Sequence, residues 1–420
     1  MSQQKGKPPF FKSHYFVIAL FPILLIILAF VLDSPLEILN GLYKIMVSPS
    51  VLLADYIEIG GIGATFINAG ILMLSSIIHA YFMGMDLNGP LIASIFTFGG
   101  FAFMGKNIIN ILPIFLGGYL YSRYMKIEFK SMLIIVLFAT TLAPAVTIIA
   151  LGLGIKLVLS IPLAILVGMI IGFVMHPSAT QMAKVHGGYN LYNIGFTGGI
   201  VGTIIASLLR SFGFELETQL ILSMKYHEFL RDFLILIFIV IIGLGYFFNK
   251  GSIRKYIKVF NIPGRQVNNF TELVGYGDTY MNMGIMGLIA VLYVIIVGGT
   301  FNGPVVAGIL TVVGFAAYGK HPKNAIPIMI GVYLAGILTI HELSSTSMVI
   351  TALFGTTLAP ITGGYGFISG IVAGFFHVIV VTNIGILHGG LNLYNNGFSG
   401  GIVAALLVPA LNGIFKKSEQ

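Results

Sequence analysis

Long apolar stretches recur along this chain and limit what it can fold into. Four of them, Tyr15–Leu32, Ile62–Met83, Ser131–Leu151 and Phe229–Phe248, approach the ~20 residues that an α-helix needs to cross a bilayer. Of the 420 residues 57% are hydrophobic and only 9% are charged, whereas roughly a quarter are charged in a soluble domain. The sequence therefore predicts an all-α integral membrane protein. A β-barrel is excluded because barrel strands alternate apolar and polar residues.

Composition and motifs exclude several kinds of chemistry. The chain has no cysteine, which rules out disulfides, thiolate catalysis and cysteine metal sites. Gly100–Lys106 and Gly314–Lys320 imitate a P-loop, but Asn107 and His321 stand where a Ser or Thr should follow the lysine. We therefore expect no ATP-driven step, no cofactor and no metal. The net charge of +8 does not indicate a nucleic-acid partner, because the basic residues of a membrane protein usually mark its topology.

The sequence contains an internal repeat, which predicts two membrane repeats, 1–213 and 214–420. Asn88-Gly89-Pro90 recurs as Asn302-Gly303-Pro304, and several other motifs recur at the same spacing of 302 − 88 = 214 residues. The polar stretch His186–Ile200 recurs as His388–Ile402, at a spacing of 202 residues because the second copy is shorter between the motifs. A duplicated scaffold without any pathway is the alternative interpretation.

Basic residues predict that the two repeats cross the membrane in opposite directions. Lys5, Lys7 and Lys12 precede the first apolar segment, whereas the basic cluster at its counterpart, which includes Arg254 and Lys258, follows the segment. The loop with Arg123, Lys126 and Lys130 has a counterpart near His341-Glu342-Leu343 without Lys or Arg. Lys416 and Lys417 then place the C-terminus, like the N-terminus, in the cytoplasm.

The number of crossings depends on how the short apolar segments are interpreted. Each half has seven apolar segments, and Gly89–Met104 and Gly198–Leu209 are short, at about 16 and 12 residues against the ~20 of a full span. If Gly89–Met104 forms a re-entrant pair with the segment that follows, five crossings remain per half. We expect 10 to 14 membrane segments, including short re-entrant helices and a solute site near the midplane.

Two repeated motifs predict helix starts that line a solute pathway. Asn88 and Asn302 are suited to cap the helices that begin at Gly89 and Gly303. A helix that starts inside the membrane exposes N–H groups that can bind an anion or a solute oxygen. A turn at the bilayer surface is the alternative.

The longer repeated stretch supplies polar groups without net charge, as a site for a small polar solute requires. Thr197 and Ser399 are predicted to cap helices, and the histidines are candidates to carry protons. Polar packing between helices is the alternative for all of them. The predicted solute-binding residues of this stretch are His186, His388, Asn190, Asn392, Asn193, Asn395, Thr197 and Ser399.

Charged residues inside the predicted membrane region complete the candidate site. Lys106 and Lys320 are predicted to attract an anionic or carbonyl-rich solute, together with Asn110 and Asn324. The alternative is that the lysines reach the headgroups from a short hairpin. Asp278 has no acidic counterpart in the first half and is a candidate to couple a proton or Na⁺. The alternative is that it lies in water near the loop Gly275–Gly277.

Two of these motifs resemble the urea-transporter family. Asn302-Gly303-Pro304 is similar to that family's Asn-Pro-Leu-Ser-Gly block, and the stretch from Tyr394 to Val403 is similar to its Gly-Phe-Asn-Gly-Val-Leu-Val-Gly stretch. The resemblance implies inverted repeats of five crossings plus a re-entrant helix. The chain also resembles an uncharacterised bacterial multi-pass membrane family of unknown function, which implies the bacterial inner membrane.

We therefore predict a transporter or channel for a small polar solute, with the lipid bilayer and that solute as its partners and homo-oligomerisation left open. Such a pathway requires a polar cavity between the halves, and a structure without one at the axis that relates them would contradict the transport interpretations. A proton- or sodium-coupled carrier of a small organic anion is the main alternative. An intramembrane enzyme that uses His186 or His388 is an alternative of another class, and it requires an acidic partner beside a histidine.

Overall fold

The computed structural model is helical throughout the part of the chain that it describes, residues 8–48, 53–216, 220–254, 256–265 and 268–415. Within these ranges extended structure is limited to two isolated bridges, so the predicted all-α membrane fold is confirmed. Ten helical segments here are long and apolar enough to cross a membrane. They are α1 (His14–Leu32), α4 (Ile62–Phe82), Leu133–Gly152 with α7 (Leu133–Ala139) and α8 (Ala143–Thr147), α9 (Leu157–Val185), α10 (Asn193–Ser211), α11 (His227–Phe248), α13 (Tyr276–Ile296), Thr346–Tyr365 with α16 (Thr346–Gly355) and α17 (Ala359–Tyr365), α18 (Phe367–Ile384) and α19 (Asn395–Phe415).

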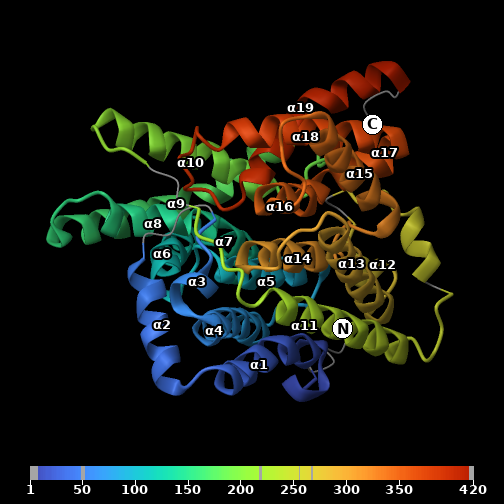
Figure 1. Ribbon diagram of the computed structural model, residues 1–420, viewed down its shortest axis with the longest axis horizontal. Helices are drawn as coiled ribbons and strands as arrows, with labels where there is room; N and C mark the ends of the chain where they lie inside the picture. Colours follow the sequence, from blue (N-terminus) through green and yellow to red (C-terminus); the bar gives the residue numbers. More distant parts are fainter. Residues whose placement is uncertain (1–7, 49–52, 217–219, 255, 266–267, 416–420) are drawn as a thin grey trace.

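Two short helices, α5 (Gly89–Gly100) and α14 (Gly303–Phe315), lie against each other at the centre of the molecule (Figure 1). Each is followed by a helix of intermediate length, α6 (Ile108–Tyr124) or α15 (Pro322–Leu338). At 1.5 Å per residue the short helices extend for about 20 Å, less than the ~30 Å of a hydrocarbon core. They have the length predicted for re-entrant helices.

Helix packing repeats between the two copies of the sequence. In the first copy α1 packs on α4 and α6 on α9, and in the second α11 packs on α13 and α15 on α18. The copies meet where α5 contacts α14 and where α10 contacts α19. Of the remaining helices, α3 (Tyr56–Gly60) corresponds to α12 (Phe270–Leu273), whereas α2 (Pro35–Val47) has a counterpart only in the irregular stretch around the 3-10 turn Tyr256–Asn261.

The start of α10 and α19 differs from the sequence prediction. The short segment expected at Gly198–Leu209 belongs to α10, which begins earlier, at Asn193, and has 19 residues. Thr197 and Ser399 consequently lie inside α10 and α19, and their predicted role as helix caps is wrong. The reason is close packing between the two helices. A Cβ on Gly397 would lie 2.9 Å from the Cα of Gly195, so both glycines are needed within the helices.

Candidate functional site

The two central helices each end in a loop that carries a buried lysine. Lys106 follows α5 and Lys320 follows α14, and neither side chain is exposed at all. Each lysine comes directly after a glycine with positive φ, Gly105 at 81° and Gly319 at 99°, a conformation that other residues rarely adopt. The lysines therefore point into the protein, and the alternative in which they reach the headgroups is wrong.

Asparagine side chains hold both lysine loops in place. Asn68 Nδ2 donates to the carbonyl oxygens of Ala102 and Lys106 at 2.8 Å, and Asn282 Nδ2 donates to the equivalent carbonyls in the second copy at 2.7 Å. Asn110 and Asn324, two predicted solute ligands, also support these loops.

Asn110 Nδ2 donates to the carbonyl oxygen of Gly105 at 2.9 Å, and Asn324 Nδ2 to that of Gly319 at 2.8 Å. Each lysine position is therefore fixed by two amides rather than by chance packing.

Lys320 has polar partners from both copies of the sequence. Its Nζ donates to the Tyr192 hydroxyl and, at 2.7 Å, to Thr356 Oγ1. The same Nζ lies 4.4 Å from the centroid of the Tyr192 ring and 5.2 Å from that of Phe315. Cation–π contacts of this kind are strongest where water is excluded.

Lys106 occupies the equivalent position but has no hydrogen-bond partner among the described residues. Its Nζ lies 5.0 Å from the centroid of Phe98 and 5.1 Å from that of Phe101. The described residues contain two ion pairs, Lys130 with Glu128 and Arg231 with Asp232. Neither buried lysine is therefore within ion-pair distance of a described carboxylate.

A stacked pair of tyrosines connects the two lysines across the contact between the copies. The rings of Tyr192 and Tyr394 lie 4.6 Å apart at 30°, and both residues are buried. Phe101, which contacts Lys106, meets Tyr394 edge-on at 4.8 Å. We call Lys106, Lys320, Tyr192 and Tyr394 the lysine–tyrosine site.

The repeated polar stretch holds the tyrosines in position. Asn190 Nδ2 donates to the Gly397 carbonyl at 3.0 Å, and Asn392 Nδ2 donates to the Gly195 carbonyl at 3.1 Å. Each asparagine therefore bonds the other copy of its own motif. The motif is therefore needed in both halves, because each copy supplies the hydrogen-bond acceptor for the asparagine of the other.

Threonines of the repeated Thr-Thr-Leu-Ala-Pro motif complete this arrangement. Thr357 Oγ1 donates to Asn190 Oδ1, and Thr141 Oγ1 donates to Asn392 Oδ1 at 2.8 Å. The same two hydroxyls accept from the backbone N–H of the tyrosines, both at 2.9 Å.

The two repeated histidines bond asparagines in the same motif. His186 Nε2 lies 2.9 Å from Asn193 Oδ1, and His388 Nε2 lies 2.9 Å from Asn395 Oδ1. Both asparagines also donate to a carbonyl of the preceding helix. These contacts fix the bend between helices. The partner of each histidine is an amide rather than the acid that the enzyme alternative requires.

Thr197 and Ser399 differ although they are equivalent. Thr197 Oγ1 donates to the Asn193 carbonyl at 3.0 Å within its own helix, whereas Ser399 Oγ lies 3.1 Å from His377 Nδ1. His377 Nε2 lies 2.9 Å from Asn396 Oδ1. His377 is buried, has no histidine counterpart in the first copy, and was not among the residues predicted from the sequence.

Asn88 and Asn302 cap the two central helices as predicted. Asn88 Oδ1 accepts from Leu91 N at 2.9 Å, and Asn302 Oδ1 accepts from Val305 N at 3.1 Å. The other copy of the chain supplies a second acceptor to each helix start. Asn269 Oδ1 accepts from Gly89 N at 2.8 Å.

Asp55 is the counterpart of Asn269 and holds the start of α14. Its carboxylate accepts from the backbone N–H groups of Ile57, Ser223 and Gly303, at 2.9, 3.0 and 3.0 Å. Asp55 lies in the connection before α3, outside the ten candidate spans. Burial raises the pKa of the Asp55 carboxyl to about 6, against the opposing effect of these hydrogen bonds. The helix start predicted to bind an anionic solute therefore already holds a protein carboxylate.

Asp278 lies at a distinct place. It is buried near the start of α13, and its Oδ1 accepts from Asn249 Nδ2 of the α11 end at 2.8 Å. Its coupling role stays a prediction.

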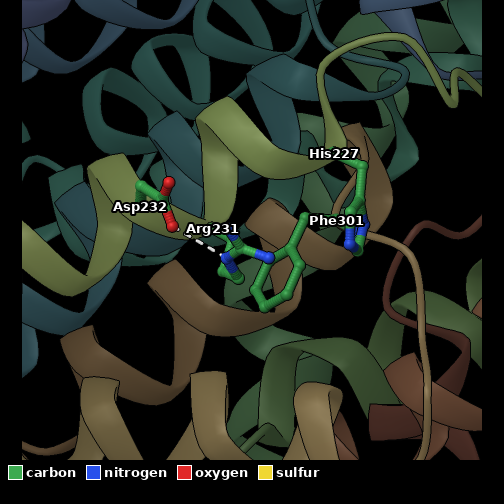
Figure 2. A network of polar contacts seen from close by, with 4 residues as sticks. All are labelled: His227, Arg231, Asp232 and Phe301. Carbon is green, nitrogen blue, oxygen red and sulfur yellow. Dashed lines mark hydrogen bonds and ion pairs between the residues drawn. The ribbon is translucent and has the colours of Figure 1, made fainter.

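Five hollows on the described part of the chain are lined by none of the four residues of the lysine–tyrosine site. A hollow of about 980 Å³ lies between the start of α11 and residues 298–301, next to the beginning of α14. Figure 2 shows His227 and Phe301 there, with Arg231 paired to Asp232; the Phe301 N–H donates to His227 Nδ1 at 2.9 Å. The polar cavity expected between the halves is thus not among these five.

Several site residues were missed by sequence reasoning although a signal existed. Asn68 and Asn282 belong to a repeated motif. Asp55 and its counterpart Asn269 align at the common spacing of 269 − 55 = 214 residues. No signal in the sequence pointed to His377.

Comparison with known proteins places the chain in a family. The model of a family described as a protein of unknown function (DUF1576) matches residues 34–211 and 248–413. The chain belongs to this family. The two matched segments agree with a repeated domain. No curated protein and no solved structure matches the chain, so the resemblance to urea transporters gains no support from these comparisons.

Proposed function

We propose that this protein is a membrane transporter that passes a small polar solute between its two halves, without ATP, through the lysine–tyrosine site. The observation that carries the proposal is the pair of equivalent lysines, Lys106 and Lys320, completely buried where the halves meet. Charged groups at membrane depth are costly and usually serve a pathway or a ligand. Here two asparagine side chains hold each lysine loop by hydrogen bonds. A scaffold without a pathway would not require buried lysines held in this way.

The proposal includes an inverted arrangement of the halves. Five candidate spans lie in each half, and an odd number of crossings turns the second half over relative to the first. Among the described basic residues, Lys12 precedes α1, whereas Arg254 and Lys258 follow its counterpart α11. Lys5, Lys7, Lys255, Lys416 and Lys417 lie outside the described residues. The basic loop after α6 and the loop without Lys or Arg after α15 then face opposite sides of the membrane.

Transport through this site requires a change of conformation. All four residues of the lysine–tyrosine site are buried, so a solute reaches them only if the site opens. The halves meet at glycine contacts and at hydrogen bonds repeated between them. Inverted repeats of this kind alternate access by rocking one part against the other around a fixed site.

The enzyme alternative lacks its required feature among the described contacts. It needs an acid beside His186 or His388, and each of these histidines bonds an asparagine instead. Transport is therefore the function that the geometry supports better.

Flux into proteoliposomes tests the proposal. Purified protein is reconstituted, and uptake of urea, acetamide, glycerol and small organic anions is measured with and without a pH gradient. We expect saturable uptake of at least one of these solutes, which falls when Lys106 and Lys320 are both replaced by Met. Uptake no faster than in protein-free liposomes for every solute would contradict the proposal.

A further inference from the structure

We propose that the lysine–tyrosine site is an anion site, in which Lys106 Nζ binds one small anion. Lys320 Nζ, which donates to hydroxyls of the protein instead, shows the same position without a ligand. This inference rests on the proposed transport function, because it names the class of solute that the pathway would carry.

The first argument is charge balance. Lys106 and Lys320 are completely buried, and the ion pairs among the described residues involve neither of them. An isolated ammonium group in a low-dielectric interior is very costly unless it loses its proton or a counter-charge accompanies it. A bound anion supplies that charge where the described protein groups do not.

The second argument is the difference between the two lysines. Lys320 Nζ donates to Tyr192 and Thr356, so its hydrogen-bonding capacity is largely used within the protein. Lys106 Nζ has no partner among the described residues. Its equivalent tyrosine, Tyr394, instead has its hydroxyl 3.4 Å from Thr97 Oγ1. An ammonium has three donors, and at Lys106 all three remain available to a ligand.

The third argument is the shape of the surroundings. Aromatic rings of Phe98 and Phe101 lie beside Lys106 Nζ, and such rings exclude water and thereby strengthen any charge–charge contact. The residues equivalent to the Lys320 partners Tyr192 and Thr356 are Tyr394 and Thr140, and their hydroxyls contact Thr97 Oγ1 and the Leu137 carbonyl instead of Lys106. The four residues of the site are buried, so we expect a small anion, of the size of formate, acetate or nitrate.

Binding to the purified protein tests the inference without requiring transport. The thermal unfolding midpoint is measured at constant ionic strength with formate, acetate, nitrate or phosphate, and with formamide and acetamide as uncharged counterparts. We expect at least one anion to raise the midpoint in a saturable manner while the amides do not, since a ligand of the folded state stabilises it.

Lys106→Met should weaken that binding by about tenfold or more, because it removes a charge-assisted contact. Lys156→Met, which removes an exposed lysine, is the matched control and should leave binding unchanged. The comparison of anions with amides on the unmodified chain decides the question even if Lys106→Met does not fold. The inference would be overturned if none of the anions raised the unfolding midpoint in a saturable manner. It would also be overturned if Lys106→Met bound the anion as tightly as the unmodified chain.

Counterflow of acetate and acetamide separates this inference from the proposed function. Transport of acetamide without any anion binding would overturn the anion site and leave the transport proposal standing. Anion binding that depends on Lys106, without flux of any solute, would support the site and overturn transport. Acetate exchange that is lost in Lys106→Met is the result expected if both are right.

Discussion

At the scale of single residues, Asp55 and Asn269 show how the two copies differ. Each accepts a backbone N–H at the start of the central helix of the other copy, but only Asp55 can ionise. Its folded-state pKa of about 6 lies above the ordinary value of 3.8. The folded protein therefore binds a proton more tightly than the unfolded chain does, and stability decreases as the pH rises from about 4 to about 6.

Replacing Asp55 with Asn should remove this pH dependence. The difference in pKa of about two pH units corresponds to about 3 kcal/mol of unfolding free energy. We expect the unfolding midpoint of the wild type, minus that of Asp55→Asn, to fall as the pH is raised from 4 to 7. Thermal unfolding in detergent across this range measures it. A difference that is constant, or that grows with pH, would show that the carboxyl is not held in this way.

The asparagines that hold the lysine loops, Asn68 and Asn282, provide a second prediction at this scale. Asn68→Leu removes both hydrogen bonds to the Lys106 loop and leaves two buried carbonyls unsatisfied, at about 1–3 kcal/mol each. We expect a lower unfolding midpoint together with loss of solute uptake. Ser76→Ala on the same helix removes one buried hydroxyl that bonds only its own helix and should change neither strongly. Normal uptake by a destabilised Asn68→Leu protein would contradict the role given to the loop.

At the scale of helices, the contact between α5 and α14 depends on glycine. A Cβ on Gly314 would lie 2.7 Å from Phe96 Cβ and 3.2 Å from Ala93 Cα. These atoms are attached directly to the backbone of α5, so they cannot move away without shifting the helix. Gly314 thus sets the distance between the two central helices.

Gly314→Ala should therefore destabilise the protein by about 1–3 kcal/mol, the usual effect of overpacking. Gly243→Ala in α11 is the matched control, because nothing lies within 4 Å of the added Cβ and alanine favours a helix by up to about 1 kcal/mol over glycine. The two unfolding midpoints should move in opposite directions. Equal shifts would mean that close packing at Gly314 is not limiting.

The helices also show which features could be predicted from sequence. Long apolar runs, the Asn-Gly-Pro helix starts and the duplication were predictable because each depends on local composition or on a repeated string. The lengths of α10 and α19 were not, since Gly195 and Gly397 permit a contact between distant helices that no local signal reports. The stacking of Tyr192 on Tyr394 was not predictable either, because it arises only when the two copies meet.

At the scale of the whole molecule, the proposed inversion predicts where two loops lie. Arg123→Cys and Glu342→Cys place single thiols in a chain that has none. Arg123 is exposed in the last turn of α6, and Glu342 is exposed in the loop after α15. We expect a membrane-impermeant maleimide to label them from opposite sides of oriented vesicles. The unmodified chain is the control and should not react. Labelling of both from the same side would mean parallel repeats.

The central claim is that a solute passes the lysine–tyrosine site, and thiol accessibility tests it most directly. Thr356, whose hydroxyl contacts Lys320 Nζ at 2.7 Å, is replaced by Cys and exposed to a small membrane-impermeant thiol reagent from each side of proteoliposomes. Ala19→Cys, at a buried position of α1, is the control and should stay unreactive. The account predicts that Thr356→Cys reacts from both sides and that the reaction stops solute uptake. Failure to react from either side, while uptake continues, would show that solutes do not pass this site.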